Sequence, residues 1–176
     1  MKPESLPAEI TEFAPQAVWE EAIKQALRSP LRRFKVGCSL FDPDTGRILS
    51  RGCAHQTLTS RSPTMTTHAE QHAIYQAKHV VDLQGSWAVV TVLSAKLRHA
   101  FSSQPCACCV TTMAAAGVEG VLFCERTKTG MVVRSYTIAE LSVQAKKKEL
   151  EATTNNKSWW AKNLKLPHSA DTLVPV

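Results

Sequence analysis

The chain of 176 residues has the length of one domain, and its 44% of apolar residues is enough to build a buried core. Its formal charge of +6 and its pI near 9.1 favour an anionic partner, such as a phosphate ester or a nucleic acid, without indicating a fold. The sequence has no basic stretch followed by an apolar run at its start, and no apolar run of about eighteen residues. We therefore expect a soluble, cytoplasmic protein with a single domain over residues 1–176, a polar tail from about residue 152 and no membrane span.

The first part of the chain predicts a helix followed by a β-hairpin. Pro15 precedes the segment at 17–28, AVWEEAIKQALR, in which apolar residues recur at helical spacing. The apolar run at 34–42, FKVGCSLFD, and the run at 47–54, RILSRGCA, are each typical of a strand and are separated by the turn PDTG. Two paired strands are therefore expected after the first helix.

A polar stretch leads from this hairpin to a second helix. Residues 55–67, HQTLTSRSPTMTT, show no clear period, so we expect a loop there. Thr66 or Thr67 can cap the helix predicted over 69–81, AEQHAIYQAKHVV, which has an apolar stripe at helical spacing.

In the second half of the chain, strands alternate with helices. The continuous apolar run at 86–95, SWAVVTVLSA, is typical of a central strand covered on both faces. A helix is predicted over 106–117 and a strand over 118–125. Thr137 and Glu140 have the spacing of a capping box and predict a further helix. This alternation predicts an α/β protein with three layers.

The stretch THAEQH, residues 67–72, places two histidines around a glutamate on the second helix. In a protease-like zinc helix the glutamate directly follows the first histidine, but Ala69 is in that place and Glu70 comes one residue later. Only His68 is therefore expected to bind metal, with Glu70 carrying protons. His72 is expected to pack on the helix beside the site.

A cysteine cluster supplies further donors. In PCACC, residues 105–109, Cys106 and Cys109 are three apart, so both face one side of an opening helical turn, where the helix dipole favours thiolates. Together with His68 they make a three-ligand zinc site with an open fourth position, as in catalytic sites. Cys108 projects to another face and is expected to be a packed thiol.

The combination of HAE at 68–70 with PCACC at 105–109 resembles the H-x-E and P-C-x-x-C signature of the cytidine and deoxycytidylate deaminase superfamily. The segment at 33–52 resembles the opening hairpin of small cytidine deaminases. The segment at 104–123 is similar to the deoxycytidylate, guanine and tRNA-adenosine branches. The resemblance covers roughly residues 17–126 and implies a three-layer α/β/α fold with a central mixed sheet of about five strands.

The resemblance also implies a hydrolytic deaminase that contains one Zn²⁺ per chain. His68, Cys106 and Cys109 would hold the zinc, and Glu70 would take a proton from the attacking water and deliver protons to the ring and to the leaving ammonia. Family members place an apolar or aromatic residue of the first hairpin in the pocket. Phe34 has the matching position, although a core position in the strand is an equal alternative.

One departure from the family affects the substrate. Free-nucleoside cytidine deaminases carry an asparagine and a glutamate after the second strand, but this chain reads GCAHQT at 52–57. His55 or Gln56 could replace the missing hydrogen bonds, or both could lie in a solvated loop. Many of those enzymes also have a cysteine where this chain has His68, which favours the nucleotide, guanine or nucleic-acid branches. The candidate substrate-binding residues are Phe34, His55, Gln56 and Ala69.

Basic residues around the hairpin and the loop before the second helix could meet a phosphate, or could form an ordinary solvated surface. They are Arg28, Arg32, Arg33, Lys35, Arg51 and Arg61. The segments KKK at 146–148 and NNKSWWAKNLK at 155–165 offer charge and aromatic rings for a nucleic acid, although Trp159 and Trp160 could equally anchor the tail.

We rank a cytosine nucleoside or nucleotide, such as cytidine, deoxycytidine or deoxycytidine monophosphate, as the first substrate class. A base in RNA or single-stranded DNA, in the manner of tRNA-adenosine deaminases, and free guanine are the alternatives. A non-catalytic, zinc-stabilised binding module is the alternative of another class, and the presence of Glu70 argues against it. The resemblance further implies a homo-oligomer.

Overall fold

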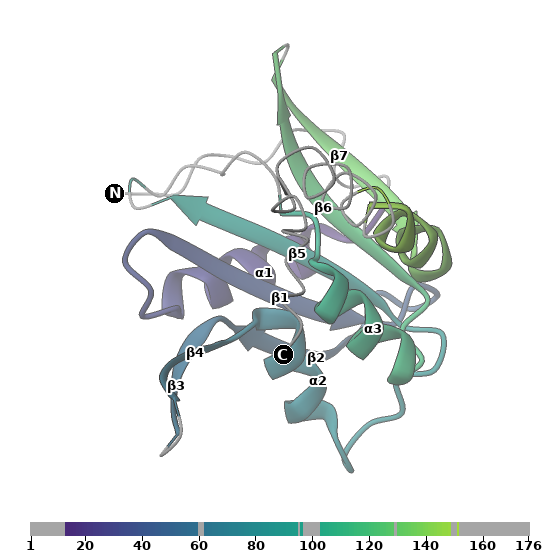
Figure 1. Ribbon diagram of the computed structural model, residues 1–176. Coiled ribbons are helices and arrows are strands. Elements are labelled where there is room, and N and C mark those ends of the chain that lie inside the picture. The colour runs from purple at the N-terminus through teal and green to yellow at the C-terminus, as the bar shows by residue number, and fades with distance from the viewer. Residues whose placement is uncertain are drawn as a thin grey trace, which may run out of the picture. The chain divides into compact units, whose positions relative to one another are not determined.

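A mixed five-stranded sheet with the order β2-β1-β5-β6-β7 forms the centre of the fold (Figure 1). Its strands are β1 (Phe34–Phe41), β2 (Ile48–Cys53), β5 (Trp87–Ser94), β6 (Gly120–Thr127) and β7 (Gly130–Thr137). Strands β5 and β6 are parallel, and the other neighbouring pairs are antiparallel. This arrangement confirms the predicted α/β class and the mixed sheet of about five strands.

The computed structural model describes residues 13–59, 62–94, 96, 103–128, 130–148 and 151. The chain divides into two compact units, Met1–Ser142 and Val143–Val176, and the sheet belongs to the first. A helix over residues 138–148 follows β7. The tail from residue 152, with its two tryptophans, lies outside the described residues, so the single domain stays a prediction. In the described part of the chain, no helix combines the length and the apolar character that a membrane crossing requires.

Helix α1 (Gln16–Arg28) covers one face of the sheet (Figure 1). It begins directly after Pro15, as predicted, and buries Trp19 completely against the sheet. Gly37 in β1 permits this close packing, because a Cβ atom there would collide with the backbone oxygen of Ala22. The helix and the sheet therefore meet backbone to backbone.

Helices α2 (Ala69–Ala77) and α3 (Ala107–Ala115) lie on the opposite face (Figure 1). Between them and the sheet lies the larger apolar core, which includes Cys38, Leu40, Ala73, Val90, Val110 and Met113. Gly52 in β2 allows α2 to lie directly on that strand, since a Cβ atom at this position would meet the backbone of Ala69 and Ala73. The three layers that the sequence predicts are thus confirmed.

Replacing Gly52 with alanine should lower the free energy of unfolding by about 1–3 kcal/mol, because the new methyl group must push α2 away from β2. Urea denaturation measures this change. The matched control is Gly85→Ala, where a Cβ atom has open space and only the positive φ of 74° causes strain. If Gly52→Ala cost no more than Gly85→Ala, the close approach of α2 would be contradicted.

The structure differs from the sequence predictions over residues 55–67. Instead of a loop, strands β3 (His55–Thr59) and β4 (Ser62–Thr67) form a separate two-stranded antiparallel sheet. Threonine favours extended backbone, which is consistent with this hairpin, but the segment lacks the alternation of apolar residues that normally signals a strand. Strand β7 likewise has no counterpart among the elements predicted from the sequence.

Candidate functional site

Two helix N-termini carry the predicted metal ligands. His68 is the N-cap residue of α2 and Cys106 is the N-cap residue of α3, and both have extended backbone angles. The prediction that Thr66 or Thr67 caps α2 is wrong, because both belong to β4. The side chain of Gln71 instead accepts a hydrogen bond from the His68 N–H at 3.4 Å, as in a capping box.

The side chains of His68, Cys106 and Cys109 converge although the cysteines follow the histidine by 38 and 41 residues. Nδ1 of His68 lies 3.5 Å from Sγ of Cys106 and 3.2 Å from Sγ of Cys109, and all three donor atoms lie within 4.8 Å of one another. Tetrahedral zinc with bonds of about 2.3 Å to sulfur and about 2.0 Å to nitrogen would separate such atoms by about 3.5 Å. The donor types and their spacing therefore fit Zn²⁺.

Burial and neighbouring groups disfavour the charged form of one thiol in this group. Burial raises the pKa of the Cys109 thiol far above its ordinary value, and the nearby Glu70 and Cys106 act in the same direction. Burial and these neighbours therefore outweigh the helix dipole, which we expected to favour the thiolate. A bound divalent ion reverses this balance, since a thiol that coordinates a metal loses its proton.

Glu70 lies beside this donor group in the first turn of α2 and is only 4% exposed. Burial raises the pKa of its carboxyl above the ordinary value of 4.5, while the charge on His68 and a hydrogen bond with Cys109 lower it in part. A carboxyl group whose pKa is shifted toward neutrality is suited to take up and release protons during a reaction.

A cavity of about 240 Å³ opens beside His68, Glu70 and Cys106. Its remaining wall is largely apolar and includes Leu31, Phe34, Val36, Ala69, Val90 and Val92. Pockets that bury drug-sized ligands are commonly about 300–1,000 Å³ in volume, so this cavity suits a molecule of the size of a single base. The structure thus brings the predicted residues Phe34 and Ala69 to the cavity that contains Glu70.

A second cavity of about 500 Å³ adjoins the first, because Leu31 and Phe34 line both. Its other lining residues are Pro30, Arg32, Arg33 and Gln56. The guanidinium group of Arg33 lies 5.4 Å from the centroid of the Phe34 ring, within the range of a cation–π contact. The second cavity therefore combines cationic, apolar and amide groups next to the base-sized one.

The other candidate cations have different places. Arg51 pairs with Glu21 at 3.4 Å, and Nζ of Lys35 donates a hydrogen bond to the backbone oxygen of Ser29 at 2.6 Å. Arg61 lies outside the described residues. Among the predicted cations that the structure describes, only Arg32 and Arg33 line either of the two cavities.

Comparison with protein families identifies the domain. The family model described as the cytidine and deoxycytidylate deaminase zinc-binding region matches residues 14–125, which include the whole donor group and Glu70. The chain belongs to this family. The match confirms the resemblance seen in the sequence and places the converging side chains within the zinc-binding region of a deaminase family.

One solved structure supports the same fold for this deaminase domain, and a second has the higher sequence identity. A cytidine deaminase from Burkholderia pseudomallei is 20% identical, with a TM-score of 0.52, and the match covers 71% of this chain and 93% of that one. A deoxycytidylate deaminase from the cyanophage S-TIM5, in its apo form, is 27% identical with a TM-score of 0.46, covering 66% of this chain and 82% of that one. A search of curated proteins gave no match.

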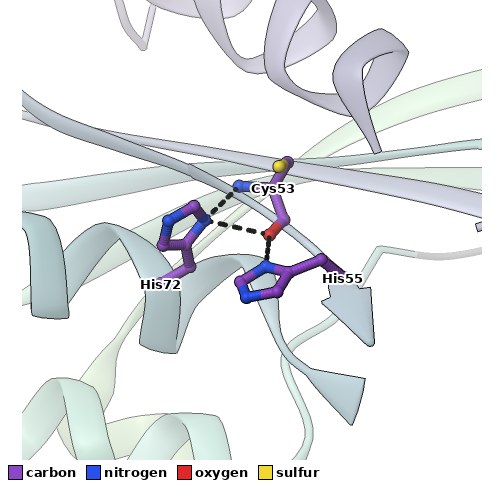
Figure 2. A group of neighbouring side chains, drawn as sticks. All are labelled: Cys53, His55 and His72. Carbon is purple, nitrogen blue, oxygen red and sulfur yellow. Dashed lines mark hydrogen bonds between the residues drawn. The ribbon is translucent and has the colours of Figure 1, made fainter. Parts of the chain in front are cut away.

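The deaminase domain contains a second group of possible metal donors, formed by Cys53, His55 and His72, whose donor atoms lie within 4.8 Å of one another (Figure 2). His72 is therefore separate from the His68 donor group, as expected. The residues that line the two cavities include Gln56 but not His55. The contact between His55 and His72 was not anticipated from the sequence, because it joins a presumed loop to a helix.

Cys108 does not behave as the packed thiol that the sequence suggested. It is exposed, and Nε2 of Gln71 lies 3.3 Å from its Sγ atom, which links α2 to α3. Because Cys108 occupies the same helical turn as the two sulfur donors without joining them, it is a natural control position. Cys38 and Cys124 are buried thiols, and Cys53 is half-buried.

Proposed function

We propose that this chain is a zinc-dependent hydrolase that converts the amino group of a cytosine nucleoside or nucleotide to a keto group and releases ammonia. The observation that carries the proposal is the buried carboxyl of Glu70 in a base-sized cavity, beside the donors of His68, Cys106 and Cys109. These three side chains would hold one Zn²⁺ per chain. A homo-oligomeric state and a cytoplasmic location stay predictions.

In the proposed reaction, three side chains hold the zinc and Glu70 transfers the protons. Zinc held by two thiolates and one imidazole would lower the pKa of a coordinated water to about 7. Glu70 takes a proton from the attacking water and delivers it to the ring nitrogen beside the reacting carbon. It then passes the remaining proton of the same water to the departing amino group. The oxygen of one water thus replaces the amino nitrogen, which leaves as ammonia.

The cavity wall supports this chemistry by holding the base and excluding solvent. Because Phe34 and Ala69 both lie on the wall, we propose that Phe34 packs against the base and that the small Ala69 side chain leaves space for it. Val90 and Val92 close the same cavity with apolar surface. Removal of water from such a site strengthens the interaction between Glu70 and the reacting groups.

The adjoining cavity favours a nucleotide over a free nucleoside as substrate. With the base beside Glu70, the sugar and phosphate would extend past Leu31 and Phe34 toward the two arginines. A guanidinium group matches the geometry of phosphate and binds it through paired hydrogen bonds. Arg32 and Arg33 are thus the candidate phosphate ligands, and Gln56 is a candidate partner for the sugar or the phosphate.

The double variant Arg32→Gln/Arg33→Gln should raise KM for deoxycytidine monophosphate about tenfold or more, because charge-assisted hydrogen bonds are lost. Turnover of deoxycytidine should change little. Steady-state ammonia release measures both substrates. The control is Arg51→Gln, since Arg51 is paired with Glu21 and does not line either cavity. An equal loss for nucleoside and nucleotide would contradict a phosphate site at these arginines.

A panel assay tests the proposed function as a whole. Zinc-loaded protein is incubated with cytidine, deoxycytidine, their monophosphates, guanine, adenosine, and single-stranded RNA and DNA. Ammonia and the mass of each product are then measured. We expect the fastest release from a cytosine monophosphate. Faster deamination of a base within a polynucleotide would favour the nucleic-acid alternative, and no release from any compound would favour the non-catalytic zinc module.

A further inference from the structure

His72 lies beside Cys53, where strand β2 of the central sheet ends, and beside His55, where strand β3 of the small sheet begins (Figure 2). Its Nδ1 atom is 3.1 Å from both the backbone nitrogen and the backbone oxygen of Cys53, the last residue of β2. Its Nε2 atom is 3.0 Å from the side-chain amide of Gln76. The histidine reaches Cys53 because the neighbouring residues, Ala73 and Gly52, are in direct contact.

One tautomer of His72 makes hydrogen bonds with both the Cys53 N–H and Gln76, and in it Nδ1 makes no hydrogen bond with the Cys53 oxygen. When the proton of His72 is on Nε2, the Nδ1 lone pair accepts the backbone N–H of Cys53, and Nε2–H donates to the amide oxygen of Gln76 turned toward it. The backbone oxygen of Cys53 then accepts from Nδ1–H of His55, 3.0 Å away. The two imidazole rings meet edge to face, with their centroids 4.6 Å apart. Both polar backbone groups of Cys53 are thus satisfied by histidine side chains.

The segment held in this way connects directly to the cavities. Ala54 is buried and lines the base-sized cavity, and its backbone is fixed by hydrogen bonds with Val36 at 2.9 Å and with the Ser29 hydroxyl at 2.6 Å. The next residue, His55, pairs across the β3–β4 sheet with Thr67, which precedes the first metal donor. A shift at Cys53 would therefore move the cavity wall and the hairpin that borders it.

We propose that His72 is a positioning residue that holds Cys53–His55 in the shape required for substrate binding. The inference rests on the proposed function, because it assigns His72 a part in that reaction without contact to the substrate. His72 acts through the backbone of Cys53, which sets Ala54 on the wall of one cavity and Gln56 on the wall of the other.

The same three side chains do not form a good metal site. Figure 2 shows that the Nδ1 atoms of His55 and His72 point at the backbone of Cys53 and not at its sulfur. A metal bound through these atoms would have to break the hydrogen bonds that satisfy the Cys53 backbone, at the cost of unpaired polar groups. A hydrogen-bonded support is therefore the better reading of the group, and zinc content distinguishes the two.

The test compares His72→Ala with His72→Asn. The Oδ1 atom of asparagine is as many bonds from Cα as Nδ1 of histidine, so asparagine can still accept the Cys53 N–H, whereas alanine cannot. We expect His72→Ala to raise KM for the preferred cytosine compound about tenfold to a hundredfold, with a smaller change in kcat. His72→Asn should stay within about threefold of the wild type. Tyr75→Ala, at a position 72% exposed on the same helix, is the control for surface changes.

Two further measurements separate a positioning role of His72 from a general loss of structure in the variant. Zinc content should be near one per chain in the wild type and in both variants. Hydrogen exchange followed by mass spectrometry should show faster exchange over residues 53–56 in His72→Ala, with little change in His72→Asn or in the core strand β5. A KM unchanged in His72→Ala, or equal losses in both variants, would overturn the proposal. So would a second zinc in the wild type that disappears in His72→Ala.

Failure of this inference and failure of the proposed function give different results. A wild type that releases no ammonia from any compound would refute the proposed function. In that case the hydrogen-exchange rates over residues 53–56 would still show whether His72 holds this segment. Unchanged rates in His72→Ala would then overturn the positioning role as well. Normal turnover in the wild type and equally in His72→Ala would refute the positioning role alone. Thermal unfolding of each variant verifies that it is folded.

Discussion

Replacing Glu70 with glutamine should reduce kcat for ammonia release by a factor of about 10² to 10⁴ or more, while zinc content stays near one per chain. Glutamine has nearly the same shape as glutamate but cannot take up and return a proton. Glu70 is not among the three side chains whose donor atoms converge, so the metal should remain. Steady-state ammonia assays and elemental analysis of the purified protein measure the two quantities.

A second buried carboxylate provides the control for this experiment. Glu21 on α1 is 8% exposed, and it pairs with Gln25 and Arg51 without lining either cavity. Its replacement by glutamine should leave turnover close to that of the wild type. Full activity in Glu70→Gln, or loss of zinc from it, would contradict the role proposed for Glu70.

Replacing Cys109 with serine should remove the zinc and the stability that zinc confers. A ligand that binds only the folded state stabilises it by about 4 kcal/mol when its free concentration is about 1,000 times Kd. The wild type should show a gain of this order when zinc is added to the metal-free protein. Cys109→Ser should show almost none, because the fully buried sulfur is one of only three donors in the converging group. Denaturation with and without zinc measures the gain.

Cys108→Ser is the matched control, since this exposed cysteine lies in the same helical turn and outside the donor group. It should retain both the zinc and the zinc-dependent gain in stability. The assignment of Cys109 as a ligand would be contradicted if Cys109→Ser kept its zinc, or if Cys108→Ser lost it.

The converging group could be predicted from the sequence because local geometry determines most of it. The spacing of Cys106 and Cys109 places them on one side of a helical turn, whatever the rest of the fold does. The HAE motif puts His68 and Glu70 at the start of another helix for the same reason. Only the meeting of the two helix ends depends on the tertiary fold, and it was predicted from the zinc-donor chemistry of the two motifs and their resemblance to the deaminase signature.

Other features depend on contacts that no local pattern reports. The β3–β4 hairpin is not marked by apolar alternation, so its pairing of His55 with Thr67 could not be read from the sequence. The contact of His72 with Cys53 requires the close approach of α2 at Gly52, which only the packed structure reveals. Similarly, helix position alone suggested that the Cys109 thiolate is favoured, whereas its burial raises the pKa.

The most direct test of the account is the deamination of a cytosine nucleotide in water enriched in ¹⁸O. Hydrolysis by the Glu70 site predicts one ammonia released for each product and one ¹⁸O atom at the carbon that carried the amino group, as measured by mass spectrometry. The zinc-loaded Glu70→Gln protein should yield almost no labelled product. A product that contains no ¹⁸O, or the absence of any product from the zinc-loaded wild type, would contradict the assignment of a hydrolytic deaminase.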